Sequence, residues 1–182
     1  LTLLVLIFLG CTKTGNGNIN NPPVLSYAKV HSTLEIRKCA KNIKNVFPKG
    51  CPKGMHLSTG SGIVVNLIPG ETIVITAGHV CKPEMKEQII DFQRTLKVLD
   101  YQGRFHQAHL IHSSLENGKG SADLCALWVP TLQVPGVTIS KIKPVVGQEL
   151  YYIGSPLGIY HPPTVPLIKG IYSGDIDASS SM

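Results

Sequence analysis

The chain has 182 residues, enough for one domain or two small ones with a buried core. Hydrophobic residues make up 43% and charged residues 15%, which excludes an intrinsically disordered chain. The 18 glycines and 13 prolines favour short strands joined by turns over long helices. Much of the net charge of +6 lies between Lys29 and Lys53, which could bind nucleic acid. Only Tyr27 and Phe47 lie nearby as aromatic residues that could stack on bases. We therefore expect a solvated basic segment and no nucleic-acid partner.

The first residues are typical of an export signal. Residues 1–10 are apolar, too short to span a bilayer, and similar to the hydrophobic region of a secretory signal peptide. Phe8-Leu9-Gly10-Cys11 resembles a bacterial lipobox, whose cysteine carries lipid, although Phe8 and Leu9 depart from the usual pattern. A plain signal peptide and a trimmed membrane helix are the alternatives. We predict a signal segment over 1–11, a flexible Gly/Asn/Pro-rich tether over 12–24, and a periplasmic or cell-envelope protein with Cys11 as its membrane anchor.

The four remaining cysteines are expected to include one disulfide. Residues 27–30 suggest a first strand, and beyond it Cys39 and Cys51 bracket a basic loop rich in Pro and Gly. Two cysteines this close in an exported protein favour a bond. Four cysteines allow three sets of pairings that the sequence does not separate. We prefer Cys39–Cys51 and expect Cys125 to behave as a small buried hydrophobic residue.

Residues 58–81 are the most informative stretch of the chain. Two runs rich in β-branched residues, 62–68 and 72–76, predict a pair of strands. Pro69-Gly70 between them fits a type II turn, because proline presets the first φ and glycine tolerates a positive second one. His79 follows the second strand, where a rigid scaffold can aim it for proton transfer. A buried hairpin that ends in a structural histidine is the alternative.

A second hairpin is predicted from 95–99 and 104–112, joined by a turn that ends in Gly103. Three histidines lie in its second strand: His106, His109 and His112. Alternation along a strand turns the middle one away from the other two, and no Cys or carboxylate stands at ligand spacing beside them. We therefore expect no metal site and no cofactor.

Asp123 stands near the start of the apolar segment 122–129, with no cationic neighbour in sequence. A carboxylate that leads into a core strand costs several kcal/mol unless it has a buried partner. A histidine N–H is a natural partner for such a carboxylate. An exposed aspartate at the start of a strand is the alternative.

These segments resemble the chymotrypsin-fold, or trypsin-like, serine proteases. Thr76-Ala77-Gly78-His79 is similar to their T-A-[AG]-H motif, and Ser61-Gly62-Ile63-Val64-Val65 to the strand that precedes it. Residues 122–129 are similar to the strand whose aspartate orients the catalytic histidine. Such proteases often bridge a cysteine directly after the histidine to the preceding strand. Cys81 is displaced by one residue and that strand has no cysteine, so we do not carry this bridge over.

The resemblance extends into the second half of the chain. Residues 147–158 and 165–174 are similar to the segments that open the second barrel of bacterial Deg/HtrA-type proteases. The resemblance implies an all-β, chymotrypsin-like double β-barrel with antiparallel Greek-key strands. It implies a complete first barrel over 25–134 that carries the histidine and the aspartate, and a partial, truncated second barrel over 135–182.

The resemblance also implies a serine-type endopeptidase acting on proteins or peptides. His79 would serve as general base and acid, and Asp123 would orient its imidazole. The family's nucleophile motif, G-[DN]-S-G-G or G-x-S-G, does not occur in the sequence. Ser61 precedes the histidine, Ser155 lies in a turn motif, and Ser179 to Ser181 lack the glycines of an oxyanion hole. We expect the chain to stop before its nucleophile and residues 1–182 alone to be inactive.

Three alternatives stay open. A cysteine protease of the same fold would differ at the nucleophile, G-x-[SC]-G. A catalytically dead, protease-like module would bind proteins without cleaving them. A non-catalytic adhesion or envelope module would match the motifs by chance, and it would not bring His79 and Asp123 within hydrogen-bonding reach.

Overall fold

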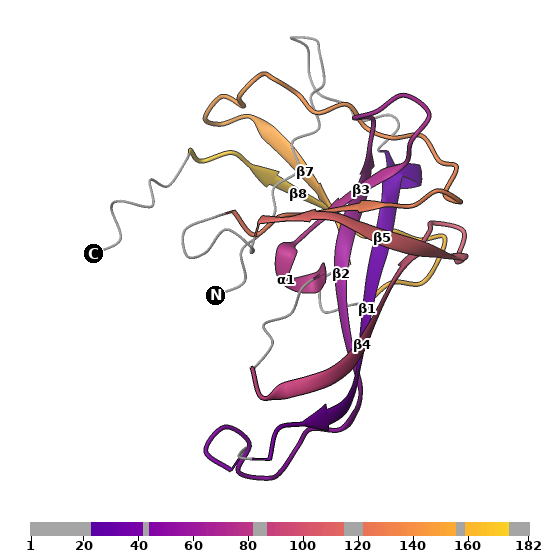
Figure 1. The fold of residues 1–182 in the computed structure, drawn as a ribbon. Coiled ribbons are helices and arrows are strands. Elements are labelled where there is room, and N and C mark those ends of the chain that lie inside the picture. The colour runs from indigo at the N-terminus through magenta and orange to yellow at the C-terminus, as the bar shows by residue number, and fades with distance from the viewer. Residues whose placement is uncertain (1–22, 42–43, 82–86, 115–121, 156–158, 175–182) are drawn as a thin grey trace.

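Figure 1 shows a computed structural model of the chain, which describes residues 23–41, 44–81, 87–114, 122–155 and 159–174. Regular structure in these residues is nearly all strand, so the all-β prediction is confirmed. The predicted signal segment, Cys11 and nearly all of the predicted tether lie outside the described residues. The elements are η1 (Val24–Ser26), β1 (Tyr27–Cys39), β2 (Gly54–Val65), β3 (Ile73–Thr76), α1 (Gly78–Cys81), β4 (Ile89–Leu99), β5 (Phe105–Ser113), β6 (Cys125–Trp128), β7 (Glu149–Ile153) and β8 (Leu167–Ile171).

Six strands form a closed barrel in the order β1-β2-β3-β6-β5-β4, and each neighbouring pair is antiparallel. The barrel interior is filled by small and medium apolar side chains, as the β-branched runs of the sequence predict. Each such residue contributes about 1.5–3 kcal/mol when it is fully buried. Representative core residues are Val30, Val64, Val74, Val98 and Leu127.

Both predicted turns have the expected backbone geometry. Gly70 has a φ of +79°, and the N–H of Glu71 donates to the carbonyl of Ile68 at 3.2 Å across the Pro69-Gly70 turn. Gly103 has a φ of +83° and donates to the carbonyl of Asp100 at 3.1 Å. These left-handed conformations explain why glycine stands at each position.

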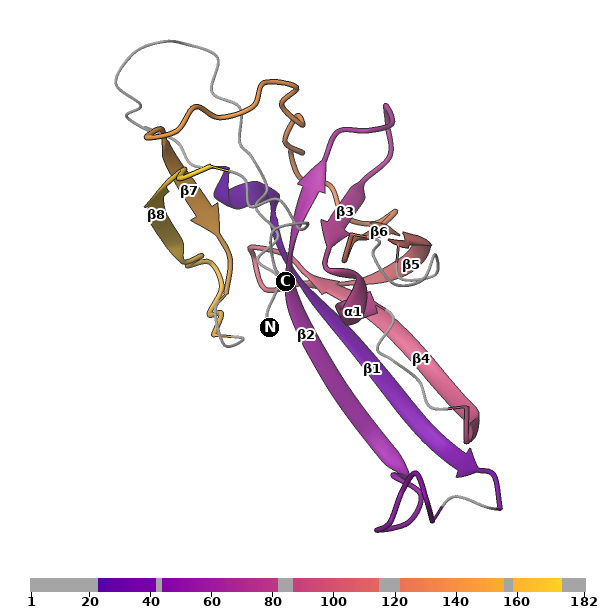
Figure 2. The same cartoon turned by 90° about the vertical axis from the view of Figure 1, so that its left-hand side faces the viewer.

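Three barrel strands are longer than predicted, and they extend beyond the barrel as an arm (Figure 2). The first strand was predicted to end at residue 30, but β1 continues to Cys39. Its buried Val30, Leu34 and Ile36 alternate with polar residues, which is the pattern of a strand with one buried face. The basic residues Lys29, Arg37 and Lys38 suggested an irregular charged segment in place of this strand. β2 and β4 likewise begin earlier than predicted, because β2 pairs with β1 from Tyr27 to Ile36 and β4 pairs with it from Lys29 to Cys39.

β7 and β8 form a separate two-stranded antiparallel sheet beside the barrel (Figure 1). Buried hydrogen bonds tie this half of the chain to the barrel. The hydroxyl of Tyr27 donates to Oγ of Ser155 at 2.8 Å, and the N–H of Ser155 donates to Oγ of Ser61 at 2.9 Å. The hydroxyl of Tyr160 donates to the carbonyl of Asp100 at 3.0 Å.

Asp100 is a buried carboxylate with a full set of donors. Its side chain is 1% exposed, and Oδ1 accepts the backbone N–H groups of Gln102 and Arg104, each at 2.9 Å. Oδ2 contacts Nε of Arg104 at 2.9 Å and Nε2 of His106 at 3.0 Å. Burial acts to raise the pKa of Asp100, but the hydrogen bonds from Arg104 and His106 outweigh it and hold the pKa below its ordinary value.

Candidate active site

The barrel topology brings the predicted histidine and aspartate to one place. β3 and β6 are neighbours although β4 and β5 separate them in the chain, and Thr76 at the end of β3 pairs with Cys125 at the start of β6. The chain leaves β3 into the single turn of α1, which carries His79. Asp123 lies two residues before β6, so it leads into this strand. Because the strands are antiparallel, both residues lie at the same end of this strand pair.

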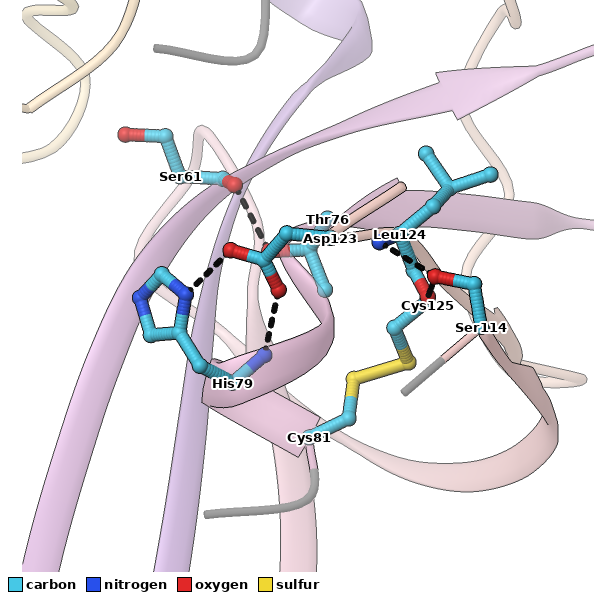
Figure 3. Close-up of a disulfide and its surroundings, with 8 residues drawn as sticks. All are labelled: Ser61, Thr76, His79, Cys81, Ser114, Asp123, Leu124 and Cys125. Carbon is cyan, nitrogen blue, oxygen red and sulfur yellow. Dashed lines mark hydrogen bonds and ion pairs between the residues drawn. A yellow bond between two sulfur atoms is a disulfide. The ribbon is translucent and has the colours of Figure 1, made fainter. Parts of the chain in front are cut away.

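Two hydrogen bonds join His79 to Asp123 (Figure 3). The backbone N–H of His79 donates to Oδ1 of Asp123 at 2.8 Å, and the ring Nδ1 lies 2.5 Å from Oδ2. The histidine side chain is 55% exposed, whereas the aspartate is 17% exposed. With Nδ1–H donating to the carboxylate, Nε2 is the nitrogen left to accept a proton from a nucleophile. The pair therefore has the geometry of an oriented general base.

The pKa of Asp123 shows that this contact favours a charged carboxylate. Burial acts to raise that pKa. Hydrogen bonds from the imidazole and from the backbone N–H groups of His79 and Gly78 outweigh burial and lower it. An ionised Asp123 holds the imidazole in the tautomer with Nδ1 protonated.

The histidine turn packs on a barrel strand through its neighbour Val80. That side chain is 2% exposed, and a Cβ placed on Gly60 would lie 2.5 Å from its Cγ2 atom. Thr76, just before the turn, donates its hydroxyl to the carbonyl of Ser61 at 2.8 Å. Neither contact could be predicted from the sequence, because both depend on how β2 and β3 are paired.

Gly60→Ala is expected to destabilise the protein by about 1–3 kcal/mol, the usual cost of overpacking a core. The added methyl group would push Val80, and with it His79, away from the barrel. Thermal unfolding measures the loss. Gly170→Ala is the matched control, since its Cβ would meet nothing within 4 Å, and it should leave the melting temperature nearly unchanged. Equal melting temperatures for all three proteins would contradict the packing described for Val80.

The described serines near the site are engaged in structural hydrogen bonds. Oγ of Ser61 accepts the N–H of Ser155, and Oγ of Ser155 accepts the hydroxyl of Tyr27. Ser155 is 8% exposed. Both serines therefore connect the two halves of the chain, and neither has the exposed, base-directed hydroxyl that a nucleophile requires. Ser179 to Ser181 lie outside the described residues.

The cysteines form two disulfides, one of which was not predicted. Cys39 is bonded to Cys51, the pairing preferred from the sequence. Cys81 is bonded to Cys125, so the prediction that Cys125 is a free hydrophobic residue was wrong, although it is fully buried. The pairing of β3 with β6 brings the two cysteines together. Cys81 and Cys125 each follow one member of the His79–Asp123 pair, called the dyad below, by two residues. This equal spacing is the feature of the sequence that could have suggested the bond.

The three histidines of β5 have different surroundings. Nε2 of His106 contacts Asp100, and its Nδ1 lies 3.0 Å from Oγ1 of Thr131. His109 lies against Trp128 outside the barrel, with ring centroids 5.4 Å apart. In the described part of the chain, no three His, Cys, Asp or Glu side chains gather as metal ligands would.

Among the helices of the described residues, none is both long and apolar enough to cross a bilayer.

Comparisons with known proteins show which fold and family this chain resembles. The chain is similar in structure to the Rv3671c protease from M. tuberculosis in its active form, with a TM-score of 0.51 and 19% identity over 84% of this chain. It also matches a serine-to-alanine mutant of that protease in its inactive form, with a TM-score of 0.48 and 18% identity over 88% of this chain. The matches cover 52% and 60% of those chains, so this chain spans little more than half their length. No curated protein sequence matches it.

The structural similarity confirms the predicted chymotrypsin-like fold. A family model described as a trypsin-like peptidase domain matches residues 60–180, which is more than half of the chain. The matched range contains both His79 and Asp123, and the fold places the two side chains in contact. The chain therefore belongs to the family of trypsin-like peptidase domains.

Proposed function

We propose that the full-length protein is a serine-type endopeptidase in which His79 and Asp123 are two members of the catalytic triad. The observation that carries this proposal is the pair of hydrogen bonds from His79 to Asp123. The aspartate holds the imidazole with Nε2 free to act. His79 takes the proton of the nucleophile during attack on the peptide carbonyl and gives a proton to the leaving amine. Protein or peptide chains are the substrates.

The nucleophile is proposed to lie after Met182. The 182 residues contain no G-x-S-G motif, and the chain order His79, Asp123, then a later serine is the order of the chymotrypsin fold. The hydrogen bonds of Ser61 and Ser155 support this placement, since both hydroxyls serve the packing of the two halves. Residues 1–182 alone are therefore proposed to be inactive.

Labelling with a fluorophosphonate, which reacts with an activated serine, tests the placement. The full-length protein should be labelled stoichiometrically at one serine after Met182, and residues 1–182 alone should stay unlabelled. Stoichiometric labelling of any serine within residues 1–182 would refute the placement. Labelling of the full-length protein by a thiol-directed electrophile instead would favour a cysteine nucleophile on the same fold. No labelling by either reagent would favour a protein-binding module without catalysis.

We further propose that the protein is exported and held at the membrane by lipid on Cys11. The apolar run over 1–10 and the lipobox-like Phe8-Leu9-Gly10-Cys11 support it. The two disulfides fit an oxidising compartment. Mass spectrometry of the protein purified from membranes should find a diacylglyceryl group on Cys11, and Cys11→Ala should release the protein from the membrane fraction.

A further inference from the structure

The disulfide between Cys81 and Cys125 lies beside the His79–Asp123 contact. Cys81 ends α1 two residues after the histidine, and Cys125 begins β6 two residues after the aspartate. Both cysteines are fully buried. Figure 3 shows the bond and the dyad side by side, joining the same two segments of the chain.

Cys125 fixes both ends of the segment that carries His79. Its backbone pairs with Thr76 in the β3–β6 ladder, and its Sγ atom is bonded to Cys81. Residues 76–81 are therefore held at their first and last positions by a single residue of β6. The histidine lies inside this short closed loop.

The noncovalent contacts of this loop come from Val80, which packs against the barrel strand at Gly60, and from the hydroxyl of Thr76, which donates to the carbonyl of Ser61. α1 is a single turn of four residues, and a helix this short is not stable by itself. At its start, the N–H of Val80 donates to the carbonyl of Ala77 at 3.2 Å. On the other side, Asp123 lies outside the strand, and the next residue, Leu124, exchanges backbone and side-chain bonds with Ser114.

We propose that the Cys81–Cys125 disulfide is the positioning element of the dyad, holding the imidazole of His79 at hydrogen-bonding distance from Asp123. Catalytic geometry tolerates little error, since a misplacement of about 1 Å can cost about 100-fold in rate. The catalytic part of this inference rests on the proposed endopeptidase function. The positioning part does not rest on that function, because the hydrogen bond between His79 and Asp123 can be observed without any substrate.

NMR of residues 1–182 tests the positioning directly. The wild-type protein should show the downfield Nδ1–H proton of a histidine bonded to a carboxylate, and an Asp123 carboxyl that titrates below the ordinary aspartate pKa. In C81A/C125A the Nδ1–H resonance should broaden or disappear, and the pKa of Asp123 should rise. C39A/C51A is the matched control, since it removes the other disulfide, and it should keep both signals. Wild-type signals in C81A/C125A would overturn the proposal.

A second variant distinguishes loss of the His79–Asp123 contact from loss of the whole fold. In C81A/C125V the valine side chain fills much of the space that the two sulfur atoms leave. The NMR methyl signals of the core valines show whether the barrel is intact. An intact barrel with a lost Nδ1–H signal supports positioning. If neither double variant folds, the bond is a requirement of the whole barrel, and the positioning proposal is overturned.

Kinetics of the full-length protein separate this proposal from the function it rests on. C81A/C125V should lower kcat for a peptide substrate by about 10–100-fold and leave KM within about twofold, because the dyad and not the binding surface is disturbed. A wild-type protein with the NMR signature but no hydrolysis would refute the endopeptidase function and leave the positioning intact. Unchanged kcat in an intact C81A/C125V barrel would refute the positioning.

Discussion

His79→Ala in the full-length protein is expected to lower kcat/KM for peptide hydrolysis by about 10⁴-fold or more. Without the imidazole, the nucleophile has no base to take its proton and the leaving amine has no acid. Asp123→Asn should cost about 10⁴-fold, because an amide can hold the ring in the wrong tautomer. Steady-state kinetics on a fluorogenic peptide measure both losses.

His109→Ala is the matched control for this experiment. That histidine is exposed on the outside of the barrel against Trp128, away from Asp123, and its loss should change kcat/KM by less than about twofold. The double variant H79A/D123N should be no worse than His79→Ala alone, because the two residues act as one unit. A His79→Ala protein with wild-type kcat/KM would remove the dyad from the mechanism.

Asp100→Ala is expected to destabilise the protein by about 1–3 kcal/mol for each buried donor that loses its acceptor, because the carboxylate is buried although the side chain of Arg104 is exposed. The change leaves Nε2 of His106 and two backbone N–H groups of the turn without their acceptor. For a chain of this size the loss corresponds to about 2–4 °C in melting temperature per kcal/mol. Asp91→Ala is the control, since its exposed side chain should contribute within about 0.5 kcal/mol.

The lowered pKa of Asp100 predicts how the free energy of unfolding depends on pH. The pKa of Asp100 is lower in the folded protein than in the unfolded chain, where it is about 3.9. Its contribution is therefore fully present above about pH 4 and is lost as the pH falls through the folded value. Asp100→Asn should lose less stability than the wild type between pH 5 and about pH 2, as measured by urea unfolding. Parallel pH profiles for the two proteins would contradict this account.

The local parts of the fold could be predicted from the sequence, whereas pairings between distant strands could not. The β-branched run before His79 and the Pro69-Gly70 turn have local causes, and the structure has both. Resemblance to a known family supplied the pairing of His79 with Asp123. Without it, the sequence showed only a carboxylate that needed a partner. The Cys81–Cys125 bond was missed because it depends on the β3–β6 pairing, which no local pattern records.

The length of the arm was missed for a different reason. Strand β1 buries Leu34 and Ile36 on one face, but the basic residues around them, Arg37 and Lys38 among others, suggested an irregular basic segment. The alternation was present in the sequence. It becomes meaningful only when β2 and β4 are known to pair with β1 on either side along this length.

The adjacency of β3 and β6 has a consequence for how the protein is made. His79 and Cys81 leave the ribosome 44 residues before Asp123 and Cys125. At about 5–20 residues per second, this delay lasts about 2–9 s. During that time the thiol of Cys81 has no native partner, while Cys39 and Cys51 have already been synthesised. Cys39 and Cys51 can therefore pair before β6 exists, whereas the Cys81–Cys125 bond can form only after Cys125 has been synthesised.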